Sequence, residues 1–259
     1  MGTIINWNGY ALPVPDGVQH AAVNGPIAFN TPDVYLIEKF GYNTDIDTTS
    51  DPEDVWSAGG LHPGKQTAAI PTLVSSDATD DEGNTGAEKV MIYGVDANGD
   101  RVSDEVTLNG VSSVNATTSM QSVDRAIVTQ AGSNKVNAGT ITIAIGGTTV
   151  AEIATHIGQT LMAWYHVPVG WTAYCGHWWA NCGRSSGYVE IDLMHENANG
   201  VHRHRERQLV SAGGSGLDRT FPTAKVFEGG SIIWIRVDET SANDMEVAGG
   251  FDLAVLKNK

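Results

Sequence analysis

The chain has 259 residues, of which 41% are hydrophobic and 17% are charged, so it belongs with globular rather than disordered proteins. The length suffices for two medium-sized domains with cores of their own, which we prefer to one large domain. The formal net charge is −15, and residues 1–158 carry −13 of it, with 6 Lys or Arg against 19 Asp or Glu. An acidic surface repels a phosphate backbone, so we expect no nucleic acid among the partners.

Residues 34–60 are the first unusual segment, because their apolar and aromatic residues are spaced too irregularly for a helix or a strand. An extended segment cannot bury Phe40, Tyr42, Val55 and Trp56 by itself. We therefore predict that residues 1–65 form an extended N-terminal arm. Its rings would dock on the body of the chain or on a neighbouring subunit.

Residues 66–157 alternate between apolar and polar positions, as half-buried strands do. The 30 glycines and abundant Thr, Ser and Val also favour strands and turns. The Asn98-Gly99 pair predicts a tight hairpin turn. The pattern predicts a β-sandwich domain with strands at residues 89–95, 101–108, 125–128 and 140–145.

Residues 150–158 are expected to be a short connector, after which the alternation resumes. The spacing of turns is that of a jelly-roll-like sandwich over residues 158–259. Strands are expected at residues 160–168, 171–180, 188–195, 201–209, 231–237 and 250–256. The predicted fold is therefore all-β, with an N-terminal extended arm followed by two β-sandwich domains of jelly-roll or Ig-like type.

The N-terminal sequence MGTIINWNGY lacks the basic start and apolar run of a Sec-type signal. No stretch approaches the roughly 18 apolar residues that a membrane helix needs, and we expect no membrane contact. Two cysteines in a chain of this size favour free thiols at Cys175 and Cys182 over a disulfide framework. Cys175 lies two residues from His177, and core packing is favoured there over a nucleophilic role.

Residues 202–207 are all polar and alternate on a predicted strand, so three of them would face each side of the sheet. Two imidazoles and a carboxylate suit zinc, but no second pair of ligands closes such a site, and we expect no metal. The arginines form a basic stripe that suits an acidic patch on another subunit, with a solvated sheet face as the alternative. One set is His202, His204 and Glu206; the other is Arg203, Arg205 and Arg207.

Acidic clusters at residues 77–82 and 96–100 lack the spacing of an EF-hand loop and are interpreted as β-turns, with a weak cation site at the first left open. The run Gly213-Gly214-Ser215-Gly216 precedes no helix, as a nucleophile elbow would require. Paired carboxylates for glycoside hydrolysis leave no spacing pattern, so a glycan-cleaving enzyme remains a third interpretation. We expect no enzymatic activity, no catalytic residue and no cofactor.

An aromatic cluster marks the second predicted domain and would suit a sugar-binding platform or an interface. Trp178 and Trp179 are adjacent, so they point to opposite faces of a strand and only one can enter the core. We expect the other at an interface, because a large exposed ring usually marks a contact. The cluster comprises Trp164, Tyr165, Trp171, Tyr174, Trp178 and Trp179.

Several segments share a pattern that covers most of residues 34–256 and leaves out residues 1–33. They are residues 39–48, 52–56 with Gly59-Gly60, the hairpin 90–108 with residues 94–96 and 106–110, then residues 137–141 and 159–170. Together they resemble a group of structural proteins of tailed bacteriophages.

The resemblance implies a virion protein assembled in the host cytoplasm. Its partners would be the major capsid protein or other virion proteins, and it would be a homo-oligomer, for example a trimer. The first expectation is a capsid decoration or cement protein. The second is a tail, fibre or baseplate component whose C-terminal domain contacts a host surface glycan. The expected partner-binding residues are Phe40, Tyr42, Val55, Trp56, Trp178, Trp179, Arg203, Arg205 and Arg207.

Overall fold

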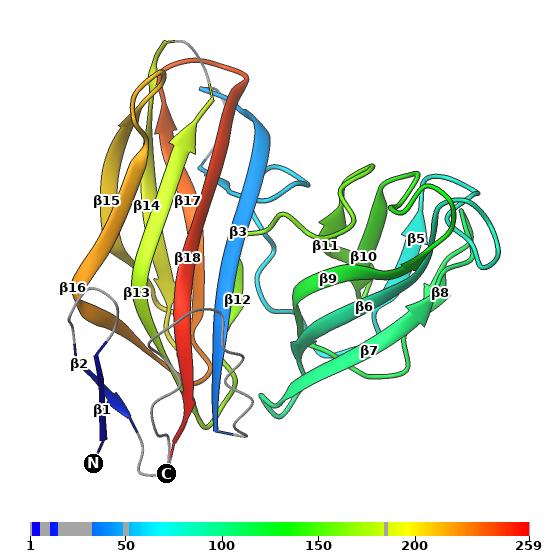
Figure 1. Cartoon of the computed structure of the whole chain (residues 1–259), viewed down its shortest axis with the longest axis horizontal. Coiled ribbons are helices and arrows are strands. Elements are labelled where there is room, and N and C mark those ends of the chain that lie inside the picture. The colour runs from blue at the N-terminus through cyan, green and yellow to red at the C-terminus, as the bar shows by residue number, and fades with distance from the viewer. Residues whose placement is uncertain (1, 6–10, 15–32, 49–51, 184–185, 259) are drawn as a thin grey trace.

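The computed structural model describes residues 2–5, 11–14, 33–48, 52–183 and 186–258. All regular structure in these ranges is β, in 18 strands and five sheets, so the all-β prediction is confirmed. The described residues contain no helix with the length and apolarity to cross a membrane. Two bodies stand side by side, a tall one built mainly from the C-terminal strands and a smaller one built from β5 to β11 (Figure 1).

The smaller body, called here the N-terminal body, contains two antiparallel sheets with strand orders β11-β10-β5-β8 and β7-β6-β9. Its strands alternate between buried and more accessible residues, as the buried and partly buried positions of Ile141–Ile145 illustrate. The strands are β5 (Thr72–Ser75), β6 (Ala87–Val95), β7 (Arg101–Thr107), β8 (Val114–Asn115), β9 (Ser122–Ala131), β10 (Ile141–Ile145) and β11 (Thr148–Ile153).

The turn between β6 and β7 shows how sequence sets the local structure. Asp96 Oδ1 accepts hydrogen bonds from the backbone N–H groups of Asn98 (2.8 Å) and Asp100 (2.9 Å). Gly99 has a φ of +84°, a conformation that glycine adopts without the steric cost of a side chain. The predicted hairpin turn at Asn98-Gly99 is confirmed.

The taller body, called here the C-terminal body, also has two antiparallel sheets. One has the order β16-β13-β18-β3, and the other has the order β12-β17-β14-β15 with β4 paired to β17. The strands are β3 (Val34–Ile46), β4 (Glu53–Asp54), β12 (Trp164–His166), β13 (Trp171–Cys182), β14 (Tyr188–Glu196), β15 (His202–Ser211), β16 (Leu217–Glu228), β17 (Ile232–Thr240) and β18 (Met245–Lys257). A separate hairpin pairs β1 (Gly2–Ile5) with β2 (Ala11–Val14).

Two hydrophobic clusters account for the packing. The first lies between the two sheets of the C-terminal body and includes Trp178, Phe227 and Phe251, all fully buried. The second fills the N-terminal body and extends into the other one, because Trp164 and Trp234 belong to it. The two bodies therefore share buried apolar surface.

Buried polar groups also join the bodies. Lys39 of β3 donates a hydrogen bond to the backbone carbonyl of Asp124 of β9. The Asp124 Oδ1 atom accepts one from the backbone N–H of His166 at 3.0 Å. Burial lowers the pKa of Lys39 to about 7 and raises the pKa of Asp124 to about 7. Neither group has bulk water around it, so each depends on the other body for a partner.

The predicted arm is corrected where the structure describes it. Residues 34–46 form β3, which pairs with β18 along its length, and Glu53 and Asp54 pair with β17. This segment is a strand of the sheet rather than a tether, because backbone pairing with β18 satisfies its N–H and C=O groups. The remainder of the predicted arm, residues 1, 6–10, 15–32 and 49–51, lies outside the described residues.

Two further expectations about elements were incomplete. The predicted connector at residues 150–158 begins with β11, and β16 was not predicted at all. The β16 sequence contains Pro222 and a run of exposed residues, so it lacks the alternation that marks a half-buried strand. The proposed domain limits at residues 66–157 and 158–259 stay a prediction.

Candidate functional site

The outer side of the sheet β16-β13-β18-β3 carries an aromatic surface, which we call the aromatic face (Leu36, Phe40, Tyr42, Tyr174, Trp179 and Val226). Strand pairing places Leu36, Ala254, Tyr174 and Val226 in one row across the four strands. A second row contains Phe40, Gly250 and Trp179. The alternate residues of the same strands face the core, so both rows point outward.

Exposure of the aromatic face is substantial for apolar side chains. Leu36 is 57% exposed and Val226 is 48% exposed, while the four aromatic residues are half-buried. Trp179 lies across Gly250, where an added Cβ would come within 2.7 Å of the indole Nε1 atom. The glycine therefore lets the ring lie on the sheet, and the face presents a broad apolar area to solvent.

A polar row separates the two apolar rows. His177 Nδ1 lies 2.9 Å from Asp252 Oδ2, and its Nε2 lies 3.0 Å from Asp218 Oδ1. Glu38 is paired with Asp252 across the neighbouring strands. The aromatic face thus offers hydrogen-bonding groups between its apolar rows, as protein interfaces commonly do.

The outer side of the other sheet, β12-β17-β14-β15, has a different character and is called here the ion-paired face. Arg207 is at its centre, with Asp192 at 2.7 Å, Glu190 at 2.6 Å and Asp238 at 2.6 Å. Hydrogen bonds to Asp192 raise the pKa of Arg207 above its usual range. Asp192 is fully buried and needs this cation to offset its desolvation.

A cleft of about 180 Å³ opens on the ion-paired face, beside the chain segment that leads into the N-terminal body. Trp164 and Trp234 supply apolar walls, and Arg236 binds Asp54 through Nε at 2.8 Å and Nη2 at 3.4 Å. The cleft is lined by Asp54, His62, Pro63, Gly64, Trp164, Glu196, His202, Ile232, Trp234 and Arg236.

His62 lies at the bottom of the cleft and is neutral. Its Nε2 donates to the Val150 carbonyl at 2.8 Å, and its Nδ1 accepts from the Gly64 N–H at 3.1 Å. Burial lowers the pKa of His62 to about 4. Burial raises the pKa of Asp54, while Arg236, the His62 backbone N–H and the Trp234 indole oppose that rise. The cleft thus joins one buried ion pair to a neutral imidazole.

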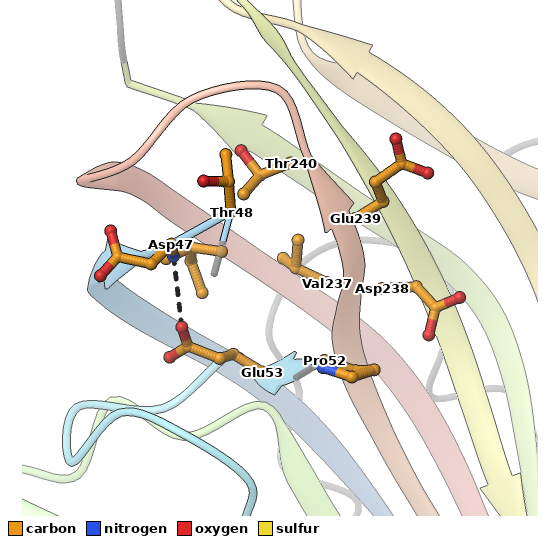
Figure 2. A pocket seen from close by; sticks show the side chains of 9 residues that line it. Asp47, Thr48, Pro52, Glu53, Val237, Asp238, Glu239 and Thr240 are labelled. Carbon is orange, nitrogen blue, oxygen red and sulfur yellow. Dashed lines mark hydrogen bonds between the residues drawn. The ribbon is translucent and has the colours of Figure 1, made fainter. Parts of the chain in front are cut away.

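A smaller pocket of about 80 Å³ lies between the end of β3 and β17 (Figure 2). The backbone N–H of Asp47 donates to Glu53 Oε1 at 3.3 Å across it, whereas Asp238 and Glu239 point away. Asp45, Asp47 and Asp244 bring carboxylate oxygens within 4.8 Å of one another nearby, and this repulsion raises the pKa of Asp45. Exposed acidic groups of this kind are common on protein surfaces and do not define a metal site by themselves.

No family model matches this chain, and no curated protein does. Similar solved structures include infectious bursal disease virus of the Gx strain, at 11% identity and a TM-score of 0.26, with 87% of this chain and 72% of that chain covered. Another is the VP2 subviral particle of the same virus, at 11% identity and a TM-score of 0.21, with 87% and 70% covered. At these TM-scores the strand arrangements differ too much for the likeness to carry an argument about fold or function.

The structure divides the residues predicted to bind partners. Phe40, Tyr42 and Trp179 meet on the aromatic face, although they are far apart in the sequence. Val55 and Trp178 are buried in the first cluster and Trp56 in the second, so these three are corrected to core positions. Their rings and methyl groups find partners inside the chain, which a single extended segment could not provide.

The predicted arginine stripe is also corrected. A β-bulge in β15 leaves Arg205 unpaired, because Leu193 pairs with Glu206 and Met194 with His204. A bulge reverses the alternation beyond it. Arg207 consequently lies with His204, at 3.1 Å, and Glu206 instead binds Arg219 and Lys225 of β16. Arg205 packs over the Phe227 ring, and Arg203 is exposed.

The structure also bears on the two cysteines and on the acidic segment at residues 77–82. Cys175 and Cys182 are both free, as predicted. Burial raises the pKa of the Cys175 thiol to about 12, which suits packing and not nucleophilic attack. The sequence leaves a cation site between Asp77 and Glu82 open. In the structure Asp80 of this segment is fully buried. Its carboxylate accepts hydrogen bonds from the Ala87, Ala138 and Gly139 backbone N–H groups and from the Ser75 hydroxyl. Asp80 therefore acts as an anchor for backbone N–H groups.

Sequence reasoning did not identify the cleft. Its residues come from six separate segments, and only tertiary folding places them together. Trp164 belongs to the aromatic cluster of the second predicted domain, and His202 belongs to the polar strand whose residue types suit zinc. Neither observation could indicate Arg236 or Asp54, because their pairing depends on the contact between β4 and β17.

Proposed function

We propose that this chain is a non-enzymatic structural component of a virus particle, and that it acts as a capsid decoration or cement protein of a tailed bacteriophage. The aromatic face is the observation that carries the proposal. Exposed aromatic rings next to polar groups are typical of protein interfaces, and contiguous apolar patches on a soluble surface mark contact sites. The resemblance of residues 34–256 to tailed-phage structural proteins supports the same function.

Binding through this face would stabilise a shell by covering the apolar rows. Phe40, Tyr42 and Trp179 would act as aromatic anchors against the major capsid protein or another virion protein. A β3 strand fixed in the sheet holds two of these anchors rigidly, so little conformational entropy is lost on binding. A homo-oligomer such as a trimer would place several aromatic faces on neighbouring capsid subunits at once.

The copy number of the protein in purified particles tests the proposal. A cement protein is expected at a copy number close to that of the major capsid protein, as measured by quantitative gel densitometry. A double variant, Phe40→Ser with Trp179→Ser, should be lost from particles. Leu209→Ser is the matched control, because Leu209 is 61% exposed on β15, which is not a strand of the aromatic face. Full incorporation of the double variant would contradict the proposal.

The second candidate is a tail, fibre or baseplate protein that contacts a host surface glycan. Trp179 and Tyr174 favour it, because half-buried rings on an outer face beside hydrogen-bonding groups such as His177 and Asp252 can hold a sugar. This function predicts tens of copies per particle or fewer. The same densitometry therefore separates the two candidates.

A further inference from the structure

The outer side of the sheet β16-β13-β18-β3 carries charge of one sign only. The structure describes all four strands, and the charged residues at their outward positions are carboxylates. Strand pairing gives these positions, because residues directly opposite on neighbouring strands share a face. Asp252, for example, lies opposite both Glu38 and His177. The outward carboxylates are Glu38, Asp218, Glu228, Glu246 and Asp252.

The cations of the same strands lie on the inner side. Each is paired across strands with a residue that packs in or against the first hydrophobic cluster, namely Lys39 with Phe251, Arg219 with Trp178, Lys225 with Cys175 and Lys257 with Trp171. Three of the four strands come from residues 159–259, which contain 9 Lys or Arg against 11 Asp or Glu. Composition alone therefore does not explain a face without cations.

Two of these inner cations are bound by the other sheet, and a third by the N-terminal body. Arg219 and Lys225 both bind Glu206 of β15. Lys39 binds the Asp124 carbonyl of β9. These cations are thus committed to contacts within the chain, and the outward carboxylates are left to solvent or to a partner.

The carboxylates at the centre of the face have hydrogen-bonding capacity left for a partner. Glu38 and Asp252 lie directly opposite each other, and like charges in this arrangement destabilise a sheet. His177 lies between Asp252 and Asp218, but in its neutral form it has one N–H and can donate to only one of them. Arg125 donates to the Glu38 backbone carbonyl from the N-terminal body and offsets part of the charge. An added cation would relieve the remaining repulsion.

The spacing of the rows on this face matches an extended chain. Residues two apart on a strand are separated by about 6.6–6.8 Å. Leu36, Glu38 and Phe40 therefore mark an apolar row, an acidic row and a second apolar row at equal intervals. An extended segment laid over the sheet presents alternate side chains at the same interval. Its complementary pattern is an apolar residue, a cation and an apolar residue at every second position.

Arginine suits this setting better than lysine. A guanidinium is planar, stacks on aromatic rings and donates two parallel hydrogen bonds to a carboxylate. Phe40 and Trp179 flank Gly250 in the row next to the acidic one, so rings and carboxylates are adjacent. A second copy of this chain is a poor occupant, because its own aromatic face brings the same carboxylates and repels the first.

We propose that the aromatic face binds a segment of its partner protein in which an arginine lies between two apolar residues, each two positions away. The guanidinium binds Glu38 and Asp252, and the flanking side chains cover the rows of Leu36 and Phe40. This inference rests on the docking function proposed for the face and adds the chemistry of the partner.

Ligand-observed NMR with the full chain at neutral pH tests this chemistry. The probes are three blocked peptides, GLTRTLG, GLTKTLG and GLTETLG, which differ only in the central residue. The arginine peptide is expected to bind with a Kd on the order of 1 mM, the lysine peptide several-fold more weakly and the glutamate peptide at least about tenfold more weakly. The inference is overturned if the arginine peptide binds no more tightly than either of the others, or if none binds up to about 10 mM.

A charge variant locates the bound arginine. Glu38→Gln with Asp252→Asn keeps the shape of both side chains and should weaken binding of the arginine peptide about tenfold. Glu82→Gln with Asp100→Asn is the matched control, because both residues are exposed on turns of the N-terminal body, and it should leave the Kd unchanged. Circular dichroism and the unfolding midpoint verify that each variant is folded. Undiminished binding by the folded charge variant would overturn the inference.

The particle assay keeps this inference separate from the docking function. Full incorporation of Phe40→Ser with Trp179→Ser would contradict the docking function, and the peptide series would still decide the chemistry of the face. Loss of that aromatic variant together with full incorporation of Glu38→Gln with Asp252→Asn would overturn the inference alone. A wild-type oligomer that becomes a monomer in the aromatic variant, as measured by sedimentation, would make a second copy the occupant and would also overturn it.

Discussion

The two outer faces of the C-terminal body differ in the kind of side chain that they present. One lies on the outer side of each of the two sheets, and the inner sides of both sheets pack on the first hydrophobic cluster. The aromatic face leaves large apolar side chains exposed, whereas the ion-paired face satisfies its charges internally around Arg207 and Arg236. A surface that has already paired its charges gains little from a partner, while an exposed apolar surface gains from being covered.

Breaking the buried ion pair should have the largest effect on stability. Asp54→Ala leaves the Arg236 guanidinium, which is only 16% exposed, without its carboxylate, and it also removes the acceptor of the His62 N–H. We expect the free energy of unfolding to fall by about 3–5 kcal/mol, as measured by urea denaturation.

Lys89→Ala is the control for that experiment. Lys89 lies 3.9 Å from Glu105 on the partly exposed surface of the N-terminal body, where a pair contributes about 0–1 kcal/mol. If Asp54→Ala costs no more than Lys89→Ala, the ion-paired face does not depend on buried charge.

Acid should destabilise the protein through His62 at the bottom of the cleft. His62 has a folded pKa of about 4, below the value near 6.5 of an unfolded histidine, so the unfolded state binds more protons between these values. The stability contributed by neutral His62 is fully present above pH 6.5 and is lost as the pH falls towards 4. The total loss is on the order of 3 kcal/mol.

The measurement compares the wild type with His62→Gln by urea denaturation at pH 7, 5.5 and 4. The variant should lose less stability in acid, because Gln does not titrate, although His166 and His195 with pKa values of about 4 still contribute in both proteins. If the free energy of unfolding depends on pH identically in the two proteins, protonation of His62 does not destabilise the folded state.

Filling the space at Gly250, beneath the Trp179 ring, should have an intermediate effect on stability. In Gly250→Ala, the new Cβ would lie 2.5 Å from the Lys39 carbonyl oxygen and 2.7 Å from Trp179 Nε1. We expect a loss of about 1–3 kcal/mol and a shift in tryptophan emission as the ring moves off the sheet. Gly176→Ala on β13 is the control, since nothing lies within 4 Å of its added Cβ, and should cost less than about 0.5 kcal/mol.

Truncating the ring itself should have the smallest effect on folding. Trp179→Ala removes a half-buried side chain from a solvent face, so the free energy of unfolding should change by about 1 kcal/mol or less. Incorporation into particles should fall sharply under the docking proposal. A stability loss of several kcal/mol with normal incorporation would show that Trp179 serves the fold and not a partner.

Much of the local structure follows from sequence alone. Period-two alternation gave the positions of β6, β7, β10, β13 and β14 to within a few residues, since alternation reports which side of a strand meets the core. Asn98-Gly99 gave its hairpin, because the turn needs a positive φ that glycine supplies. Adjacent Trp178 and Trp179 were expected to point to opposite faces of a strand, and Trp178 is buried in the core while Trp179 is half-buried on the outer face.

What the sequence alone determined is therefore the all-β class, its turns and the inward or outward sense of single strands. Only tertiary structure decided that residues 34–46 pair with β18, that a bulge moves Arg207 beside His204, and that Asp54 meets Arg236. The physical reason is the distance along the sequence over which each kind of interaction acts. Alternation and turn chemistry act over a few neighbouring residues, whereas strand partners are chosen by the burial and hydrogen bonding of segments separated by up to about two hundred positions.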